Sequence, residues 1–159
     1  KLMSIKFGER KSVFEVEEGN LLQPKFDSNG LIPVITIDIS DNQVLMHGYM
    51  NKEAFEKSIS SKFAHYWSRS RKCIWRKGET SGFTQEIREI RIDDDQDCVI
   101  FFVKLNGIAA SCHVGYKSCF YRKLELNAGE YKEKLIFTEK NKTFNKKKVY
   151  GNAPNPTKL

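Results

Sequence analysis

The apolar residues of this sequence are divided into many short segments, and this division constrains the fold more than any other feature. The longest uninterrupted apolar run covers only residues 98–103, which is far too short to cross a bilayer as a helix. The segments are rich in β-branched and aromatic residues, as strands are. We therefore predict an α+β protein, dominated by a twisted sheet or pseudo-barrel, with one or two short helices.

The clearest predicted hairpin joins strands at residues 31–39 and 44–50 across the turn SDNQ. Asn51 is suited to cap a helix over residues 52–60, whose apolar face we expect to pack on the sheet. Further strand-like segments lie at residues 63–67, 73–77, 84–92, 98–105, 108–114, 119–126 and 135–139. The chain should therefore be mostly sheet.

A length of 159 residues suits one domain with a real core. We divide the chain into an N-terminal extension (1–30), a central domain (31–126) and a lysine-rich C-terminal extension (127–159). The net charge is +7, and the C-terminal extension carries eight lysines against three glutamates, so the remainder carries only +2. Because this basic tail has no arginine, solvated lysines are favoured over a nucleic-acid contact.

The cysteines and the first residues bear on the cellular compartment. The start KLMSIKF lacks the apolar core of a signal peptide, and none of the four cysteines forms a CxxC pair. Free thiols or metal ligands are therefore expected rather than a disulfide framework. We predict a cytoplasmic protein that does not enter a membrane.

Four aspartates occupy five positions directly before the most apolar run: Asp93, Asp94, Asp95 and Asp97. One interpretation is a polar turn between two strands, and the other is a cation site that offsets the repulsion among the carboxylates. In an extended chain, alternate residues are about 7 Å apart, so three carboxylates reach one ion only if the segment bends. The spacing lacks the glycine and glutamate of an EF-hand loop, which leaves an ion such as Mg²⁺ possible.

The segment CHVGYKSC places Cys112 and Cys119 around a turn at Gly115, with His113 beside the first thiol. Two thiolates make half of a tetrahedral zinc site. The third ligand could come from Cys98, an aspartate, His113 or another protomer. The alternative is that these are small buried cysteines with no ligand role.

Residues 65–82 combine basic side chains with hydroxyls and glycines. Arginine forks, hydroxyls and flexible backbone amides suit a phosphate monoester, and Trp67 or Trp75 could stack on a base. This stretch alone does not distinguish a nucleotide site from an RNA-binding strand pair. Its candidate phosphate-binding side chains are Arg69, Arg71, Arg76, Lys77, Thr80 and Ser81.

Four blocks, taken together and in order, closely resemble the phosphoribosyl-AMP cyclohydrolase family of histidine biosynthesis. They are VLMHGYMNKEAFEKS, YWSRSRKCIWRKGETSG, Gln85 with EIRIDDDQD, and SCHVGYKSCFYR, and they extend from about Leu31 to Arg122. The resemblance implies hydrolytic opening of the adenine ring of phosphoribosyl-AMP between N1 and C6. It also implies an intertwined cytoplasmic homodimer that binds zinc and magnesium, with the zinc site shared across the dimer interface.

The resemblance also implies roles for individual residues. Asp93, Asp95 and Asp97 would bind magnesium, and Cys112 and Cys119 would supply two zinc ligands. We expect His113, or one of the carboxylates, to move protons to and from the attacked ring. The residues expected to hold the substrate and its phosphates are Arg69, Arg71, Trp75, Arg76, Lys77, Thr80 and Ser81.

One departure from the family pattern concerns the third zinc ligand. The family has cysteine between the first two aspartates, whereas this chain has Asp94 there and Cys98 four positions later. These two positions have the same strand parity, which predicts that both point away from the magnesium face. Cys98 is the expected replacement and Asp94 the alternative. Two additional residues between Gly107 and Cys112 could re-aim one side of the site.

Two other hypotheses remain open at this point. A zinc-containing nucleic-acid-binding module would explain the basic tail and the stretch WSRSRKCIWRK, although such a module has no need of the aspartates. A relative that keeps the fold but has lost catalysis would explain Asp94. A nucleotide substrate remains the main prediction, and no nucleic-acid partner is expected.

Overall fold

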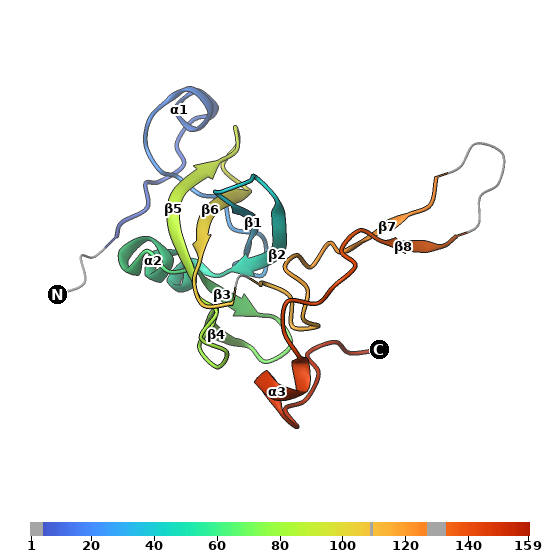
Figure 1. The fold of residues 1–159 in the computed structure, drawn as a ribbon. Helices are drawn as coiled ribbons and strands as arrows, with labels where there is room; N and C mark the ends of the chain where they lie inside the picture. The colour runs from blue at the N-terminus through green and yellow to red at the C-terminus, as the bar shows by residue number, and fades with distance from the viewer. Residues whose placement is uncertain (1–4, 109, 127–132) are drawn as a thin grey trace.

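The computed structural model describes residues 5–108, 110–126 and 133–159, and its centre is a four-stranded sheet (Figure 1). The strands follow the order β2-β1-β6-β5. Their bounds are β1 (Ile32–Asp38), β2 (Val44–Met50), β5 (Gln85–Ile92) and β6 (Val99–Leu105). β1 is parallel to β6, and the other two neighbouring pairs are antiparallel.

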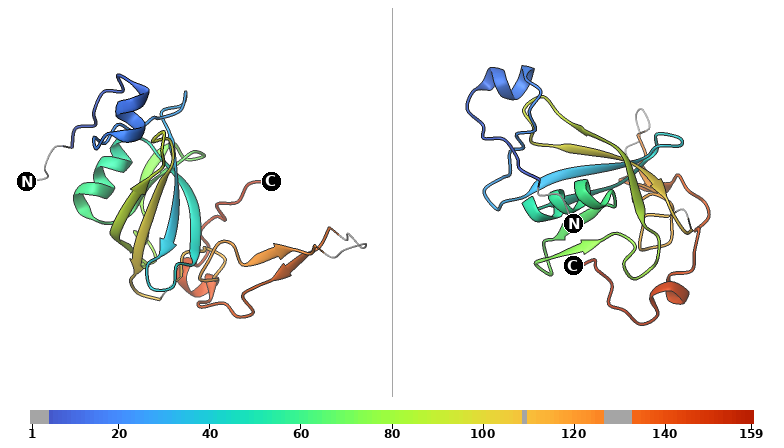
Figure 2. Two further views of the ribbon diagram at one scale, coloured as in Figure 1. Left: turned by 90° about the horizontal axis from the view of Figure 1, so that it is seen from above. Right: turned by 90° about the vertical axis from the view of Figure 1, so that its left-hand side faces the viewer.

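Two hairpins flank this sheet. β3 (His65–Ser68) pairs with β4 (Cys73–Arg76) and lies under the sheet, whereas β7 (Arg122–Leu124) pairs with β8 (Leu135–Phe137) in an arm that extends away from it (Figures 1 and 2). The helices are α1 (Val13–Glu18), α2 (Lys52–Ser61) and α3 (Lys146–Tyr150). None of the described helices is long and apolar enough to cross a bilayer.

The core lies between one face of the sheet and α2 with β3. Burial alternates strictly along β1, as expected for a strand with one covered face. The Asn51 side chain accepts a 2.8 Å hydrogen bond from the Ala54 N–H, which caps α2 and directs Phe55 into the core. The opposite face carries Ile35 and Ile37 of β1 and Ile100 and Phe102 of β6, all only half-buried.

The N-terminal segment packs against this core. The Phe7 ring lies 5.2 Å from the Phe55 ring and 6.1 Å from the Phe26 ring. Gln23 is completely buried. Figure 2 shows α1 at one end of the sheet, on the opposite side of the molecule from α3. Residues 5–25 are thus part of the folded unit.

The prediction of an α+β fold rich in short strands is confirmed, including the first hairpin and the helix that begins at Lys52. Four details were wrong. The four-stranded sheet is open rather than a pseudo-barrel, and three helices are described rather than one or two. The predicted strand at 108–114 is a loop in its described part, because its backbone groups bond within a tight turn around Gly115. The predicted strand at 119–126 shortens to β7.

Candidate functional site

Residues 110–119, which we call the cysteine loop, are closed by their own backbone. The Ser111 N–H donates to the Lys117 carbonyl at 2.8 Å, and the Cys112 N–H donates to the Tyr116 carbonyl at 3.2 Å. Gly115 makes the turn at φ +118°, a conformation that favours glycine. The loop therefore has a defined shape although it contains no strand.

This loop brings Cys112 and Cys119 together beside β2. The Cys119 N–H donates to the Leu45 carbonyl at 2.7 Å, and Cys112 is buried whereas Cys119 is exposed. A hydrogen bond from the Cys119 thiol, with a smaller contribution from the charge of Lys77, lowers the pKa of Cys112 to about 6. The same hydrogen bond raises the pKa of Cys119. The pair therefore gives up its first proton readily and holds the second, as two adjacent metal-binding thiols do when no cation is present.

Lys77 supplies a positive charge next to this pair. Its Nζ donates to the Ser111 carbonyl at 2.5 Å and lies 5.6 Å from the centre of the Trp75 ring. Burial lowers the pKa of Lys77, and the neighbouring cysteines oppose that effect. The ammonium group is thus held against the cysteine loop and partly balances a thiolate there.

A buried chain of hydrogen bonds supports the loop from the core. The hydroxyls of Thr36 and Tyr66 lie 2.6 Å apart, and the Tyr66 hydroxyl donates to Gln85 Oε1 at 2.6 Å. Gln85 Nε2 then donates to Ser111 Oγ at 3.1 Å. Thr36, Tyr66 and Gln85 are completely buried. Because a buried polar group left without its partner is costly, this chain fixes the residue just before Cys112.

The C-terminal segment covers the outer side of the cysteine loop. Glu139 accepts hydrogen bonds from the backbone N–H groups of Lys117 at 3.0 Å and Ser118 at 3.1 Å. The Thr143 hydroxyl donates to the Gly115 carbonyl at 2.9 Å. A Cβ atom at Gly115 would lie 2.6 Å from the Phe144 carbonyl oxygen, so this close approach requires glycine. At least part of the lysine-rich extension therefore holds the loop in place.

His113 lies between the loop and this C-terminal segment. It is half-buried, and burial lowers the pKa of its imidazole, with smaller contributions from Lys146 and Lys77. A hydrogen bond with Asn155 opposes the shift. The ring is therefore neutral near pH 7 and able to accept a proton.

Residues 93–98, the acidic turn, bend sharply at the other end of the sheet. Asp93 Oδ1 accepts from the backbone N–H groups of Asp97 at 2.9 Å and Cys98 at 3.1 Å, and Gln96 has φ +58°. Carboxylate oxygens of Asp93, Asp95 and Asp97 lie within 4.8 Å of one another. Hydrogen bonds with Asp93 and then Asp95 raise the pKa of Asp97 to about 6.

The bend has two consequences for the sequence-based predictions. First, the segment is bent, which is the condition under which three carboxylates can reach one ion. The parity argument for Asp94 and Cys98 was wrong, because residues 93–98 form a turn and not an extended strand. Burial, with Asp93 and Asp97, raises the pKa of Cys98, so its thiol stays protonated in this arrangement.

Within one chain, Cys98 does not meet the other cysteines. Cys98 precedes the first residue of β6, whereas Cys119 is anchored at Leu45, which lies two strands away at the level of Phe101 and Phe102. The strand spacings correspond to a separation of roughly 15 Å. Among the described residues, only the three aspartates form a group of three or more clustered metal-binding side chains. The cysteine pair therefore has no third ligand from the described part of its own chain.

The predicted phosphate-binding residues do not form one cluster. Arg69 stacks over the Tyr49 ring at 4.2 Å, and Arg71 Nε donates to Ser68 Oγ at 3.4 Å, both at the tip of the β3–β4 hairpin. Arg76 lies at the opposite end of that hairpin, about 13 Å along a four-residue strand. The loop after it contains Lys77, Thr80 and Ser81. Of the predicted set, only Trp75 and Lys77 have contacts that place them beside the cysteine loop.

Comparison with known proteins decides the family. The sequence model described as "Phosphoribosyl-AMP cyclohydrolase" matches residues 46–121. The chain is 46% identical over 136 residues to the phosphoribosyl-AMP cyclohydrolase of Bradyrhizobium diazoefficiens, covering 86% of this chain and 94% of the relative. For that of Sinorhizobium medicae the identity is 41% over 139 residues, covering 87% and 91%. The chain belongs to the phosphoribosyl-AMP cyclohydrolase family.

The segment that matches the cyclohydrolase family model runs from β2 to the end of the cysteine loop, so it contains both the acidic turn and the cysteine pair. The alignments with whole cyclohydrolases extend well beyond it. Sequence reasoning did not assign roles to several residues that shape the two regions in this chain. These are Thr36, Tyr66, Gln85, Ser111 and Glu139 at the cysteine loop, and Gln23 and Gln96 at the acidic turn.

The sequence contains only weak signals for these supporting residues. Gln85 stood inside a block that resembles the family, and Gln96 interrupts the run of aspartates. Gln23 and Glu139 belong to the two extensions, where no pattern indicated a contact with the site. Their partners lie more than ten residues away along the chain, which local periodicity does not report.

Proposed function

We propose that this chain is itself a phosphoribosyl-AMP cyclohydrolase. Water would add to C6 of the adenine ring, the N1–C6 bond would break, and N1 would take up a proton. The oxygen of the water would end in the carboxamide of the formimino-carboxamide ribotide. The observation that carries this proposal is the adjacent thiol pair of Cys112 and Cys119, which shares a proton beside Lys77, in a chain 46% identical to a named cyclohydrolase.

The cysteine pair fits a zinc ion. Thiolates are preferred zinc ligands, and the low pKa of Cys112 makes one available at neutral pH. Zinc, when bound, acts as a Lewis acid and lowers the pKa of a water ligand to about 7. The exposed side of Cys119 leaves room for a further ligand from another chain. Cys98 is our preferred third ligand, and Asp94 is the alternative.

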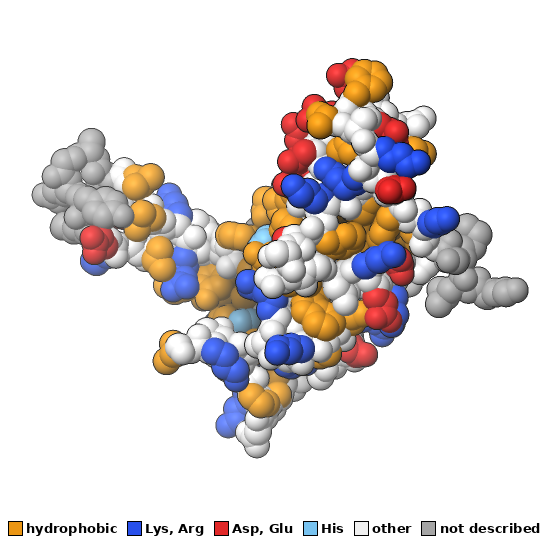
Figure 3. Space-filling view, turned by 180° about the vertical axis from the view of Figure 1, so that it is seen from behind, with side chains coloured by type: hydrophobic (Ala, Val, Ile, Leu, Met, Phe, Trp, Pro, Cys, Tyr) orange, Lys and Arg blue, Asp and Glu red, His pale blue; other side chains and the backbone are white. Residues whose placement is uncertain are grey.

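This ligand set implies a homodimer, because one chain holds Cys98 far from the pair. Two features support a dimer. Ile35, Ile37, Ile100 and Phe102 leave the second face of the sheet apolar and half-exposed. The β7–β8 arm also presents exposed apolar side chains, as Figure 3 shows. These are Leu124, Leu126, Leu135 and Phe137.

The acidic turn fits a magnesium ion. Mg²⁺ prefers carboxylate and water oxygens, and the oxygens of Asp93, Asp95 and Asp97 already lie within 4.8 Å of one another. Magnesium, when bound, would offset the repulsion among the three carboxylates and would help to hold the substrate phosphates. Arg69, Arg71 and the loop with Thr80 and Ser81 remain proposed phosphate contacts.

The side chains around the cysteine pair have complementary proposed tasks. His113 is neutral near pH 7, so it can take a proton from the attacking water. Trp75 can stack on the base while its ring packs 5.0 Å from Tyr66. Arg76 lies at the end of β4 beside the loop that carries Lys77, where it can orient the ribotide.

The direct test is a ring-opening assay followed by ultraviolet absorbance. Zinc- and magnesium-loaded protein should convert phosphoribosyl-AMP, and a chelator should stop it. Cys119→Ser should remove activity, whereas Cys73→Ser, which changes an exposed cysteine in β4, should keep it. If the fully metallated protein leaves phosphoribosyl-AMP unchanged, the proposed function is wrong.

A mixing experiment tests the shared zinc site separately. Cys98→Ala and Cys112→Ala chains should each be inactive alone. A mixed dimer would contain one intact site, so an equal mixture should regain about a quarter of the wild-type activity if the site is shared in a two-fold dimer. No recovery in a mixture shown to exchange subunits would contradict a site built from Cys98 of one chain and the cysteine pair of the other.

A further inference from the structure

Gln96 connects the acidic turn to the N-terminal segment. Its side chain is only 5% exposed, and Oε1 accepts from the Gln23 N–H at 2.7 Å. Nε2 donates to the carbonyls of Val16 at 2.9 Å and Leu21 at 3.2 Å. Its own carbonyl accepts from the Lys25 N–H at 2.7 Å. Every polar atom of this side chain is thus satisfied by a segment more than 70 residues earlier in the chain.

The backbone conformation of Gln96 links this connection to the positions of the three aspartates. Gln96 lies between Asp95 and Asp97, has φ +58°, and its N–H donates to the Asp93 carbonyl at 3.1 Å. A side chain other than glycine enters this left-handed region at a cost, so the surroundings must hold it there. The buried bonds of the Gln96 side chain provide that restraint, and they act at the centre of the bend that gathers the three carboxylates.

Gln23, on the other side of the connection, is held by several hydrogen bonds, although its buried Oε1 has no partner among the described residues. Gln23 is completely buried, its Nε2 donates to the Glu9 carbonyl at 2.7 Å and to the Glu15 side chain, and Arg10 donates to its carbonyl at 2.6 Å. The Ser12 hydroxyl caps α1. Gln23 therefore organises the N-terminal segment, and Gln96 joins that segment to the acidic turn.

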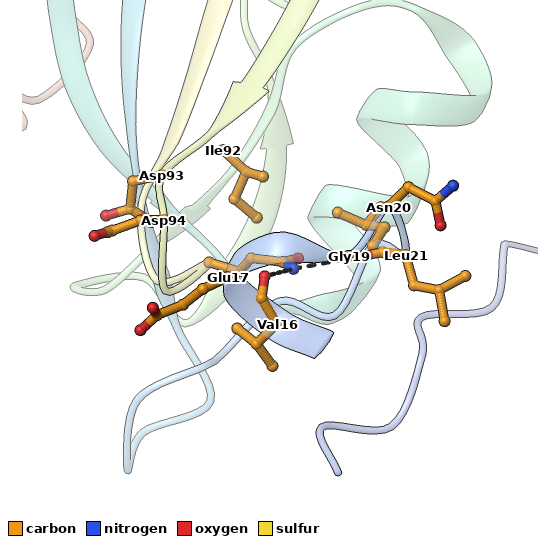
Figure 4. Close-up of a pocket in the computed structure, with 10 residues that line it drawn as sticks. Val16, Glu17, Gly19, Asn20, Leu21, Ile92, Asp93 and Asp94 are labelled. Atoms are coloured by element: carbon orange, nitrogen blue, oxygen red, sulfur yellow. Dashed lines mark hydrogen bonds between the residues drawn. The ribbon is translucent and has the colours of Figure 1, made fainter. Parts of the chain in front are cut away.

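Figure 4 shows how closely the two parts approach each other. Val16 and Leu21 from the N-terminal segment line one pocket of about 380 Å³ together with Ile92, Asp93 and Asp94 from the end of β5 and the turn. The aspartate oxygens repel one another and would separate in a free loop. Because the turn is already bent, binding of the ion does not have to supply the free energy that brings the three carboxylates together.

We propose that residues 9–25 act as a clamp on the acidic turn, and that Gln96 is a positioning residue that sets the Mg²⁺ affinity of Asp93, Asp95 and Asp97. This inference rests on the magnesium assignment in the proposed function. Linkage makes the coupling reciprocal, so bound Mg²⁺ also stabilises the clamp. The N-terminal segment thus contributes to the metal site without supplying a ligand.

The test is a calorimetric titration of zinc-loaded protein with Mg²⁺ alone. Gln96→Asn keeps an amide and tolerates a positive φ, but its side chain is one methylene too short to reach its partners. Gln96→Asn and Gln23→Ala should each weaken Mg²⁺ binding about tenfold, as loss of outer-shell partners does. Gln43→Ala is the matched control, because it removes a half-buried glutamine amide at the other end of the sheet, where it bonds Glu139.

Two further readouts separate positioning from a general loss of structure. Turnover of both variants should return to near the wild-type level at saturating Mg²⁺, which a lesion in folding would not allow. In the wild type, Mg²⁺ should slow hydrogen exchange of the Lys25 and Gln23 amides, and it should slow it less in Gln96→Asn. Both amides donate to Gln96, so they report directly on the clamp.

The possible failures are distinguishable. If the wild type binds Mg²⁺ and both clamp variants bind it within about twofold of the wild type, the clamp is wrong and the magnesium site stands. If Gln43→Ala weakens Mg²⁺ binding as much as they do, the effect is not specific to the clamp and the inference also fails. If the wild type binds no Mg²⁺, or Asp95→Asn binds it unchanged, the magnesium assignment fails together with the inference.

Discussion

The cysteine loop and the acidic turn lie at opposite ends of the same sheet and are held in different ways. The loop is supported from inside by the buried hydroxyl of Tyr66 and the amide of Gln85, and from outside by Glu139. The aspartates of the acidic turn are exposed or half-buried, and the turn is held by its own backbone and by the buried side chain of Gln96. One region is fixed by the core of the central domain, and the other depends on the N-terminal extension.

This difference matches the charge that each region carries. The pKa of Cys112 is lowered to about 6 and the Lys77 ammonium lies beside the cysteine pair, so a positive charge partly balances a thiolate there. The three aspartates have no such partner among their described contacts, and hydrogen bonds with Asp93 and Asp95 raise the pKa of Asp97. We therefore expect the cysteine loop to keep its shape without metal, and the acidic turn to depend more on its cation and its clamp.

Removing a thiol of the cysteine pair should produce the largest loss of turnover. The same variant tests whether the cysteine loop and the acidic turn are separate sites. Cys112→Ser should lose zinc and lower turnover by at least about a thousandfold, because Lewis-acid stabilisation contributes several kcal/mol and each 1.36 kcal/mol is tenfold in rate. Its Mg²⁺ affinity should stay within about twofold of the wild type, since no ligand of that ion changes. Metal analysis and calorimetry measure the two ions independently.

Asp93→Asn is the reciprocal variant. It should keep its zinc and lose Mg²⁺ affinity, because it removes a carboxylate from the acidic turn alone. Loss of both metals in either variant would mean that the two regions form one coupled centre. The comparison between two ends of the sheet would then be wrong.

The next prediction concerns the proposed third zinc ligand, which would be Cys98 or Asp94 of a partner chain. Cys98→Ala should lose most of its zinc and its turnover, whereas Asp94→Ala should keep the zinc and lose activity only modestly. The reason is that a thiolate is a softer and stronger zinc ligand than an exposed carboxylate. If both variants keep full zinc and full rate, neither residue is the third ligand.

A third prediction concerns the internal support of the cysteine loop. Tyr66→Phe leaves Gln85 Oε1 and the Thr36 hydroxyl without a buried partner, so unfolding should become about 1–3 kcal/mol easier. Zinc affinity should fall as well, because Gln85 is joined to Ser111. Urea unfolding and zinc competition measure the two effects. Tyr121→Phe, which alters a half-exposed ring, is the control and should change neither.

The sequence was most informative where structure depends on local pattern. Alternation along residues 32–38, the SDNQ turn and the capping asparagine each predicted an element that is present. The strand at 108–114 was mispredicted because its residues have strand propensity but bond within a loop closed by Gly115. Short apolar segments are ambiguous in this way when tertiary bonds compete with propensity.

Candidate metal ligands could be proposed from the sequence, whereas most residues that support them could not. The aspartates, the cysteine pair and His113 were identified from spacing and resemblance. The strand-parity argument failed at Asp94 because a residue in the left-handed region, Gln96, bends the segment. The contacts of Gln23, Gln96 and Glu139 could not be predicted, because each contact joins segments distant in the chain and leaves no periodic signal. Such contacts depend on the completed fold.

The smallest expected effect is a pH dependence that separates the two regions. Because its neighbours raise the pKa of Asp97 to about 6, the folded protein binds this proton up to about pH 6, whereas the unfolded chain releases it near pH 4. The metal-free protein should therefore lose stability as the pH rises from about 4 to about 6. Asp97→Asn should lack this contribution, so the difference between variant and wild type in urea midpoint isolates it.

Magnesium sharpens the same measurement. A bound cation favours the ionised carboxylates, so saturating Mg²⁺ should remove the wild-type loss of stability between about pH 4 and about pH 6 and leave Asp97→Asn nearly unchanged. Zinc should not substitute for Mg²⁺ here, because the thiol pair that binds it lies at the other end of the sheet. Identical pH profiles for the two proteins without metal would show that the three carboxylates do not share protons, and the acidic turn would then need no cation to offset its charge.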